Sequence, residues 1–431
     1  MTEHVHRHHH ADMLSVEEAR DIILQAFETL EPACMNITDS IGLVISEDVY
    51  SSINIPPLDN SGMDGYALRS EDVQSATLAN PVSLRIVGTV PAGHLPDFVI
   101  EAGEAARIMT GAAIPDGANS VVPFEETTES EGFDRSELRD IGIRTPVKRG
   151  SDIRLAGGDV TVDQKVLQAG TLINPSTIAV LASLGRDIIN VYRKPEVAIL
   201  STGDELIEPG LSSEPGKIYD SNTSGLIASV IAAGGIPKPF GIVRDNLSQL
   251  EKKISEAMNS DLVVTSAGVS KGDYDVVKDA LASRGILNFW SIRMRPAKPL
   301  AFGVLNDEKL AKVTPLIGLP GNPVSSMVAF EQFCRPAIRK MLGKKSSLRP
   351  TIKATLTDHI YNHDGRRVYA RVKIVNEAGS YTATTSGSQE SNILTSMAYA
   401  DGLAICPEDV PVKRPGESVT VIMLNWPEEM I

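Results

Sequence analysis

Cysteine and long apolar runs are both scarce in this chain. Only three cysteines occur among 431 residues, and Cys34, Cys334 and Cys406 stand far apart without a CxxC pair. This scarcity argues against a cysteine zinc site and against a disulfide framework. No apolar run is long enough to span a membrane and no segment resembles a signal peptide, so we expect a cytoplasmic protein without membrane contact.

Positive charge is scarce as well. The 41 Lys and Arg residues are outnumbered by 55 Asp and Glu residues, which leaves a formal net charge of −14. Such a chain repels nucleic acid and anionic membranes on average, so we expect neither as a partner. The histidine-rich start of the chain is either a metal-binding tail or a disordered terminus, and we leave it out of the site. Its histidines are His4, His6, His8, His9 and His10.

The length and the hydrophobic content of the chain indicate several folded domains. A length of 431 residues and a hydrophobic content of 42% predict two to four domains with substantial cores. Ser15 is a good N-cap for a helix that we expect to reach about residue 30. A β-rich region follows, and it ends before a further helix. We expect strands at 83–90 and 105–108, a loop at 150–158 and the helix at 176–184.

Strands and helices alternate from Pro195 to about residue 340, and short β-runs return beyond residue 343. The expected fold class is therefore multidomain α/β plus β. It has a central doubly wound α/β domain, a β-rich N-terminal region and a small C-terminal β-barrel-like domain. Helices are expected at 221–233, 247–258 with Asn246 as cap, 274–284 and 324–341; late strands are expected at 351–356, 366–375, 381–385, 402–405 and 418–423.

Three strand-to-loop junctions in the α/β region carry most of the functional information. The apolar runs Val197–Leu200, Leu262–Thr265 and Leu316–Leu319 each lead into small polar residues. Ligands of open α/β sheets bind just beyond the carboxyl ends of the strands, so we expect the three loops to form one pocket. Its N–H groups, hydroxyls and carboxylates would suit a phosphorylated ligand handled with a metal ion.

Each of these loops also has a purely structural interpretation. In the first, Asp204 and Glu205 could bind Mg²⁺, or Asp204 could cap the next helix. The second, residues 266–275, could be an anion-binding nest or could merely supply a helix cap. The third, residues 320–325, could be an anion site at a helix N-terminus or a plain connector. A basic cluster of Arg293, Arg295 and Lys298 could likewise hold an oxyanion or be a solvated patch.

Seven strings in one order carry a family resemblance that covers nearly the whole chain from about residue 13. They are LDNSGMDGYALR, ARIMTGAAIPDGA, LSTGDEL, IYDSN, TSAGVSKGDYD, RPAKPLAFG and GLPGNPVSS. The chain resembles the molybdopterin molybdenumtransferases, the bacterial MoeA-type enzymes that are similar to the C-terminal domain of gephyrin. The resemblance implies that molybdate is inserted into adenylylated molybdopterin, that AMP is released, and that Mg²⁺ assists.

The resemblance also implies an assembly and a domain plan. The family forms a homodimer in which the cleft lies between the α/β domain of one subunit and the β-rich region of the other. A transient contact with the molybdopterin adenylyltransferase is also expected. The implied domains are a linker and dimerisation domain at 1–53 and 149–193, an inserted β-rich domain at 54–148, a molybdopterin-binding α/β domain at 194–342, and a C-terminal β domain at 343–431.

Carried over position by position, the resemblance implies the site residues. The catalytic residues would be Asp59, Thr110, Glu205, Asp245 and Asp275, of which the last three would hold the metal. Phosphate would bind at the second and third loops, and the basic cluster would attract molybdate. The substrate-binding residues would be Thr202, Gly203, Asp204, Asp220, Asn222, Ser266, Ala267, Gly268, Ser270, Arg295, Lys298, Pro320, Gly321, Asn322, Pro323, Ser325, Arg371 and Ser391.

The chain departs from the family pattern at three of these loop positions. The family commonly reads SGGxS where Ala267 stands, and KPGKP where Arg295 and Ala297 stand. Arginine keeps the charge but binds oxyanions as a planar fork, and each alanine adds a methyl group at a tight turn.

Alternative functions are a non-catalytic gephyrin-like scaffold and tungsten insertion by the same chemistry. A nicotinamide dehydrogenase is disfavoured because no GxGxxG turn opens the α/β domain.

Overall fold

The chain folds into two compact units. The computed structural model describes residues 13–131, 139–212, 214–243, 247–266, 285–307 and 312–425. Unit 1 comprises residues 1–34, 42–46 and 190–431, and unit 2 comprises residues 35–41 and 47–189. Within the described ranges, no helix combines the length and apolar character needed to cross a membrane.

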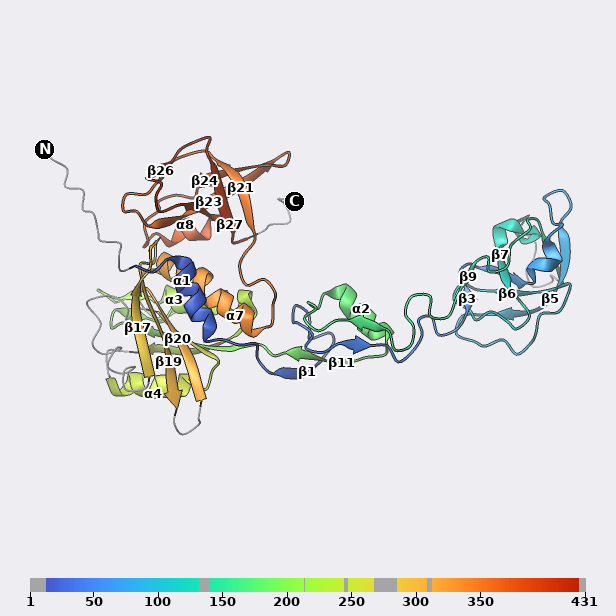
Figure 1. Ribbon diagram of the computed structural model, residues 1–431, viewed down its shortest axis with the longest axis horizontal. Helices are drawn as coiled ribbons and strands as arrows, with labels where there is room; N and C mark the ends of the chain where they lie inside the picture. The colour runs from blue at the N-terminus through green and yellow to red at the C-terminus, as the bar shows by residue number, and fades with distance from the viewer. Residues whose placement is uncertain are drawn as a thin grey trace. The chain divides into compact units, whose positions relative to one another are not determined.

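Unit 1 contains a six-stranded sheet with the order β15-β12-β16-β20-β19-β17. Figure 1 labels its strands β17, β19 and β20. The first four strands are mutually parallel, as an α/β domain requires. β19 and β17 continue the sheet in antiparallel fashion, so the sheet is mixed at one edge, which the sequence did not indicate. The strands span Ile236–Val243 (β15), Glu196–Thr202 (β12), Leu262–Ser266 (β16), Lys312–Leu319 (β20), Pro299–Asp307 (β19) and Gly285–Ser291 (β17).

The continuous apolar run of β12 is buried on both faces, which is why it does not alternate with polar residues. Ala198 and Leu200 pack in one core cluster with Leu250 and Ile254 of helix α4. The edge strand β15 carries Pro237 and Pro239. Helices of this domain are α3 (Ser221–Ala233), α4 (Leu247–Ala257), α6 (Pro323–Ala329) and α7 (Arg335–Met341), with a π-turn at Phe330–Cys334 joining the last two.

The expected helices that fall within the described residues are confirmed, with differences at their ends. α1 spans Val16–Gln25 and begins with a capping box between Ser15 and Glu18. It ends at Gln25, earlier than residue 30, and further along the chain the Leu30 N–H donates to the Met341 carbonyl at the end of α7. The helix expected at 274–284 and the cap Asn246 lie outside the described residues.

The C-terminal part of unit 1 is a closed β-barrel of five strands. β23, β24, β21, β27 and β25 pair in that order, and a further pairing of β23 with β25 closes the ring. Alternate residues point inward, so that β21 reads as exposed and buried in turn. The strands are β21 (Thr351–Leu356), β23 (Arg367–Glu377), β24 (Ser380–Thr385), β25 (Gly402–Cys406) and β27 (Ser418–Met423).

Unit 2 contains a five-stranded sheet with the order β7-β4-β6-β5-β8. A short strand, β9 (Ile153–Arg154), lies within the expected loop at 150–158, where it pairs with β3 (Asn60–Ser61). The helix expected at 176–184 is α2 (Pro175–Ser183), capped by Asn174. The five strands are β4 (Gly65–Leu68), β5 (Val82–Val90), β6 (Glu104–Ile108), β7 (Ser120–Pro123) and β8 (Asp140–Ile143).

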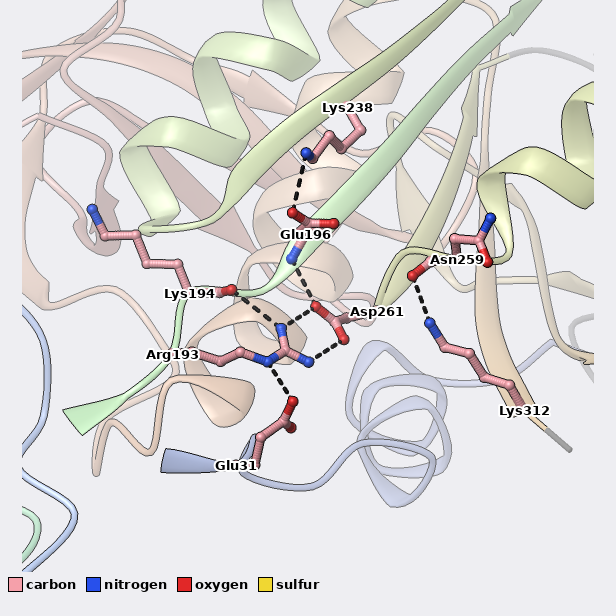
Figure 2. A network of polar contacts seen from close by, with 8 residues as sticks. All are labelled: Glu31, Arg193, Lys194, Glu196, Lys238, Asn259, Asp261 and Lys312. Atoms are coloured by element: carbon pink, nitrogen blue, oxygen red, sulfur yellow. Dashed lines mark hydrogen bonds and ion pairs between the residues drawn. The ribbon is translucent and has the colours of Figure 1, made fainter. Parts of the chain in front are cut away.

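An ion-pair network fixes the start of the α/β sheet, as Figure 2 shows. The Arg193 guanidinium donates from Nη1 and Nη2 to the two oxygens of Asp261, at 2.6 and 2.7 Å. Its Nε donates to Glu31 at 2.7 Å. Asp261 also accepts the Glu196 N–H at 2.8 Å, so one carboxylate joins the beginnings of β12 and β16. The network therefore ties the incoming chain to the amino ends of these strands.

Candidate functional site

A cavity of about 1000 Å³ lies in unit 1 at the carboxyl ends of β12, β16 and β20. These strands are neighbours in the sheet, so the three loops singled out in the sequence do meet. The remaining wall comes from the basic turn and from the C-terminal barrel. The expected site residues that line it are Thr202, Glu205, Asp220, Asn222, Ser266, Arg295, Lys298, Pro320, Gly321, Asn322, Pro323, Ser325 and Ser391.

Glycine at position 203 allows the first loop to bring Glu205 to the cavity. Gly203 has φ +149°, and a Cβ built on it would lie 2.6 Å from Oε2 of Glu205. The Glu205 carboxylate therefore occupies space that any other residue at position 203 would fill. Gly203 itself and Asp204 are not among the lining residues.

Asp220 lines the cavity but its carboxylate already has two partners. It caps helix α3 by accepting the Thr223 N–H at 3.0 Å on Oδ1. The Thr223 hydroxyl donates to Oδ2 at 2.6 Å, so the Ser201 hydroxyl, 2.6 Å from Thr223 Oγ1, is left to donate to Thr223. This arrangement is that of a structural cap on the cavity wall.

Asn222 joins the second and third loops across the cavity floor. Its side-chain nitrogen donates to Ser266 Oγ at 2.7 Å and to the Gly321 carbonyl at 2.7 Å. Because Ser266 Oγ accepts this bond, its own proton remains available to a ligand oxygen. Ser266 is 1% exposed, so the hydroxyl is held in a largely desolvated position.

The third loop is joined to the barrel through Ser391. Asn322 is the N-cap residue of α6, yet its side chain makes no capping bond. Its amide donates instead to Ser391 Oγ at 3.0 Å, and the Ser391 carbonyl accepts the Val324 N–H at 3.2 Å. A barrel loop thus satisfies a backbone donor in the first turn of a helix of the α/β domain, and closes one side of the cavity.

The basic wall consists of Arg295, Lys298 and Arg366. Arg366, which the sequence analysis missed, donates from Nη1 to the Met294 carbonyl at 3.2 Å and from Nε to Asp364 at 2.9 Å. Arg293, the third member of the expected cluster, is not a lining residue, and its N–H donates to the Leu14 carbonyl at 2.8 Å.

Arg371 has a different position from the one that the resemblance suggested. It is 1% exposed and does not line the cavity. Its guanidinium donates to the carbonyls of Ser388 and Glu390 at 2.9 and 3.0 Å, which supports the loop that carries Ser391. Burial, and then the nearby charge of Arg295, lower the pKa of Arg371 to about 10.

Asp59 and Thr110 belong to unit 2. Asp59 accepts the Ala156 N–H at 2.7 Å. Thr110 donates its N–H and its hydroxyl to Oδ1 of Asp64, at 2.7 and 2.9 Å. Both hydrogen bonds lower the pKa of the Asp64 carboxyl, and the backbone bond has the larger effect. The hydroxyl bond also holds the Thr110 side chain in one orientation.

The remaining expected residues and most of the expected metal site lie outside the described residues. These residues are Asp245, Ala267, Gly268, Ser270 and Asp275. Among the described residues, no three His, Cys, Asp or Glu side chains converge to hold a metal ion. Mg²⁺ prefers oxygen ligands such as carboxylates, phosphate oxygens and water, so Glu205 on the cavity wall fits this ion.

Apolar residues of the wall were also missed. Ile218 and Tyr219 of β14 (Ile218–Tyr219) line the cavity and are 58% and 46% exposed. The Tyr219 hydroxyl donates to the Leu211 carbonyl at 2.9 Å, which fixes the ring. A two-residue strand is too short to show a period in the sequence, so its orientation could not be inferred.

The fold and the cavity define a multidomain α/β protein with a ligand-sized cavity beyond its strand ends. Family models match three successive stretches of the chain. They are the MoeA N-terminal region (domain I and II) at 14–185, a probable molybdopterin binding domain at 198–340 and the MoeA C-terminal region (domain IV) at 353–424.

Relatives match over nearly the whole length. The molybdopterin molybdenumtransferase 2 of Mycobacterium tuberculosis is 35% identical over 416 residues, which cover 95% of this chain and 99% of that protein. The molybdopterin molybdenumtransferase of a Nostoc species is 36% identical, with 97% and 95% covered. A crystal structure of a molybdopterin biosynthesis MoeA protein from Pyrococcus horikosii has a TM-score of 0.80 at 31% identity and covers 96% of this chain and 100% of that one. The chain belongs to the molybdopterin molybdenumtransferase (MoeA) family, which confirms the resemblance.

Proposed function

We propose that this chain inserts molybdate into adenylylated molybdopterin and releases AMP. The observation that carries the proposal is a cavity lined both by three strand-end loops and by Arg295, Lys298 and Arg366. The same lining carries the acidic residues Glu205, Asp220 and Glu390, and Arg366 is paired with Asp364. Arg295 and Lys298 would therefore bind an anion, and Glu205 would bind the metal ion that accompanies it. The names of the relatives support a molybdopterin-type substrate.

The cavity offers separate groups for phosphate and for oxyanion. Ser266, Ser325 and the N–H groups around Gly321 would bind the phosphates of the pterin nucleotide. The basic wall would bind molybdate by charge-assisted hydrogen bonds. The phosphoanhydride bond breaks with addition of one water to give AMP, and two dithiolene sulfurs replace one oxygen of molybdate, which leaves as water after taking up both thiol protons.

Glu205, together with Asp245 and Asp275, would hold Mg²⁺ at the phosphoanhydride. When bound, the ion would neutralise charge on the leaving phosphate. The chain's own contribution is orientation, because Gly203 lets the Glu205 carboxylate reach the wall and Asn222 fixes Ser266. No side chain is required as a nucleophile.

The first prediction is that Glu205→Gln loses AMP release. Purified protein is incubated with adenylylated molybdopterin, molybdate and Mg²⁺, and AMP is measured by chromatography. Loss of one charged ligand should slow release at least about a hundredfold, a magnitude typical of removing one electrostatic contact from a transition state. Glu208→Gln is the matched control, since Glu208 is exposed and is not a lining residue. Wild-type protein that releases no AMP would disprove the function, and a fully active Glu205→Gln variant would disprove the metal assignment alone.

A further inference from the structure

A basic cluster lies in unit 1 where helix α7 leads into the linker of residues 342–350 that precedes the barrel. Arg335 and Arg339 stand one turn apart on α7 and share one face of the helix. Arg335 Nη1 donates to the Ser347 carbonyl at 2.9 Å, and Arg339 Nε donates to the Ser346 carbonyl at 2.7 Å. Because these carbonyls belong to successive residues, the two guanidinium groups lie close together. The members of the cluster, none of which lines the cavity, are Lys194, Arg335, Arg339, Lys344 and Arg349.

The Glu331 carboxylate is already engaged by one member of the cluster. Nε and Nη2 of Arg349 donate to its two oxygens at 2.7 and 2.9 Å. The oxygen that accepts from Arg349 Nε lies 3.8 Å from Nε of Arg335, so these two arginines share it. Arg335 is only 8% exposed, and its Nε has no hydrogen-bond partner within the described part of the chain. Glu331 therefore leaves Arg335 incompletely paired.

Two lysines complete the cluster. The Lys344 N–H donates to the Arg339 carbonyl at 3.0 Å. Its Nζ lies 4.0 Å from the position that a Cβ on Gly234 would take, at the C-terminus of α3. Lys194 is exposed, and Figure 2 shows its ammonium group pointing away from the ion-pair network. Burial, and then the charges of Arg339, Arg335 and Lys194, lower the pKa of Lys344, so these cations repel one another.

Structural roles do not balance the charge of the cluster. Cations are favourable at helix C-termini, and α3 and α7 both end here. Each helix end carries about half a negative charge, so the two ends and Glu331 together supply about two negative charges against five cations. Burial, and then the charge of Arg349, lower the pKa of Arg335 to about 10. Among the described residues, Glu331 is the only acid that opposes the lowered pKa values of the cluster. About three positive charges therefore remain without a counter-charge.

We propose that the basic cluster is a second anion-binding site, separate from the cavity, for a free tetrahedral oxyanion of the phosphate class. Arg339 and Lys344 are half-buried, so a small ion in solution can reach them. Guanidinium forks match the oxygens of such an ion, and the Lys344 ammonium adds a point charge. The bound ion would join α7 to the linker, because Arg339 belongs to the helix and Lys344 to the linker. The inference does not depend on the reaction proposed for the cavity.

The second prediction is that Lys344→Gln weakens phosphate binding and stabilises the phosphate-free protein. Purified full-length protein is titrated with inorganic phosphate by isothermal titration calorimetry at constant ionic strength. Loss of one charge-assisted contact should weaken binding about tenfold. Without phosphate, the midpoint of thermal unfolding should rise, because the variant lacks a partly desolvated cation that its neighbours repel. A lysine that only caps a helix end would give the opposite shift, since its removal destabilises the helix.

Two further variants separate the cluster from other sources of binding. Lys345→Gln is the matched control, because it removes the same charge from the next, exposed residue of the linker, and its phosphate affinity should stay within about twofold of wild type. Lys298→Gln removes a cation from the cavity wall. The effect of Lys344→Gln should persist in that background, since the cluster does not line the cavity.

Three results would overturn the proposal. The wild-type protein could fail to bind phosphate, or Lys344→Gln could keep the wild-type affinity. The effect of Lys344→Gln on binding could also vanish in the Lys298→Gln background, which would assign the phosphate to the cavity. A Lys344→Gln variant that binds more weakly but unfolds at a lower temperature would show a helix cap instead of a binding site. All of these measurements are independent of AMP release, so they are distinguishable from failure of the proposed function.

Discussion

At the scale of single residues, the first loop depends on the missing side chain of Gly203. Oε2 of Glu205 lies 2.6 Å from the position that a Cβ of residue 203 would take, which is too close for an unchanged carboxylate. Substitution there therefore acts twice, through the backbone at φ +149° and through displacement of the carboxylate. A substitution at Gly210 separates the two effects. Its φ is +95°, so the backbone would be strained, but a Cβ there would meet nothing within 4 Å and would displace no side chain.

The third prediction compares Gly203→Ala with Gly210→Ala. Both variants should lose about 1 kcal/mol of unfolding free energy, measured by urea denaturation, because alanine is strained at positive φ. Only Gly203→Ala should slow AMP release, by about a hundredfold, since a small misplacement of a catalytic group has effects of that order. Equal activities of the two variants would show that the position of Glu205 does not matter.

The sequence predicted those site residues that follow buried strands. Thr202, Ser266 and Gly321 could be placed together because parallel strands end at one edge of the sheet. Arg366 and Glu390 could not be placed at the cavity from the sequence, because they reach it from the barrel. Their position depends on how that barrel packs against the α/β domain. Arg371 was expected at the substrate site but does not line the cavity, because its guanidinium donates to loop carbonyls, and such buried contacts have no signature in a strand pattern.

At the scale of elements, apolar runs and helix caps in the sequence were sufficient to predict most helices and strands of unit 1. α3 spans Ser221–Ala233 as expected, since Asp220 caps it and Gly234 ends it in the left-handed conformation. The antiparallel pair of β17 and β19 was not expected, because the apolar run of β19 is buried much as a parallel strand would be. β9 escaped notice because two residues show no alternation.

The fourth prediction concerns the network at the amino ends of β12 and β16. Arg193→Lys should lower the free energy of unfolding by about 2 kcal/mol, because lysine cannot reproduce the two-pronged contact with Asp261. AMP release per folded molecule should stay unchanged, since the cavity lies at the opposite ends of these strands. Denaturation curves and the AMP assay on the same sample test both statements.

Lys238→Gln provides the control from the same network (Figure 2). Lys238 pairs with Glu196 at 3.1 Å, but both side chains are more than 40% exposed, at 46% and 42%. Such an exposed pair contributes about 0–1 kcal/mol. If both variants lose the same stability, the two-pronged contact of Arg193 with Asp261 contributes no more to stability than an exposed ion pair.

At the scale of the whole molecule, the expected site residues are divided between two compact units. Asp59 and Thr110 belong to unit 2, whereas the cavity is built entirely from unit 1. The family resemblance implies that a cleft combines residues of two subunits. The sequence could suggest this only through the family, because no local pattern reports an interface between copies.

The fifth prediction tests a cleft shared in this way. Asp59→Asn and Glu205→Gln variants, each inactive alone, are mixed under conditions that allow subunit exchange. Random exchange in a two-fold dimer leaves about a quarter of the clefts intact, so AMP release should recover to about that fraction of the wild-type value. No recovery, with exchange verified by mass spectrometry of differently tagged subunits, would show that each cleft is formed by one chain.

One edge of the α/β sheet also limits how copies of this chain can associate. The Ile236 N–H of β15 donates inward to the Pro195 carbonyl, so Pro237 and Pro239, which alternate with it, face the open side. Proline has no N–H group, and this edge therefore lacks donors at the two positions that an added strand would need. Two copies cannot merge their sheets into one continuous sheet through β15, and the same prolines protect the exposed edge against fibrillar stacking.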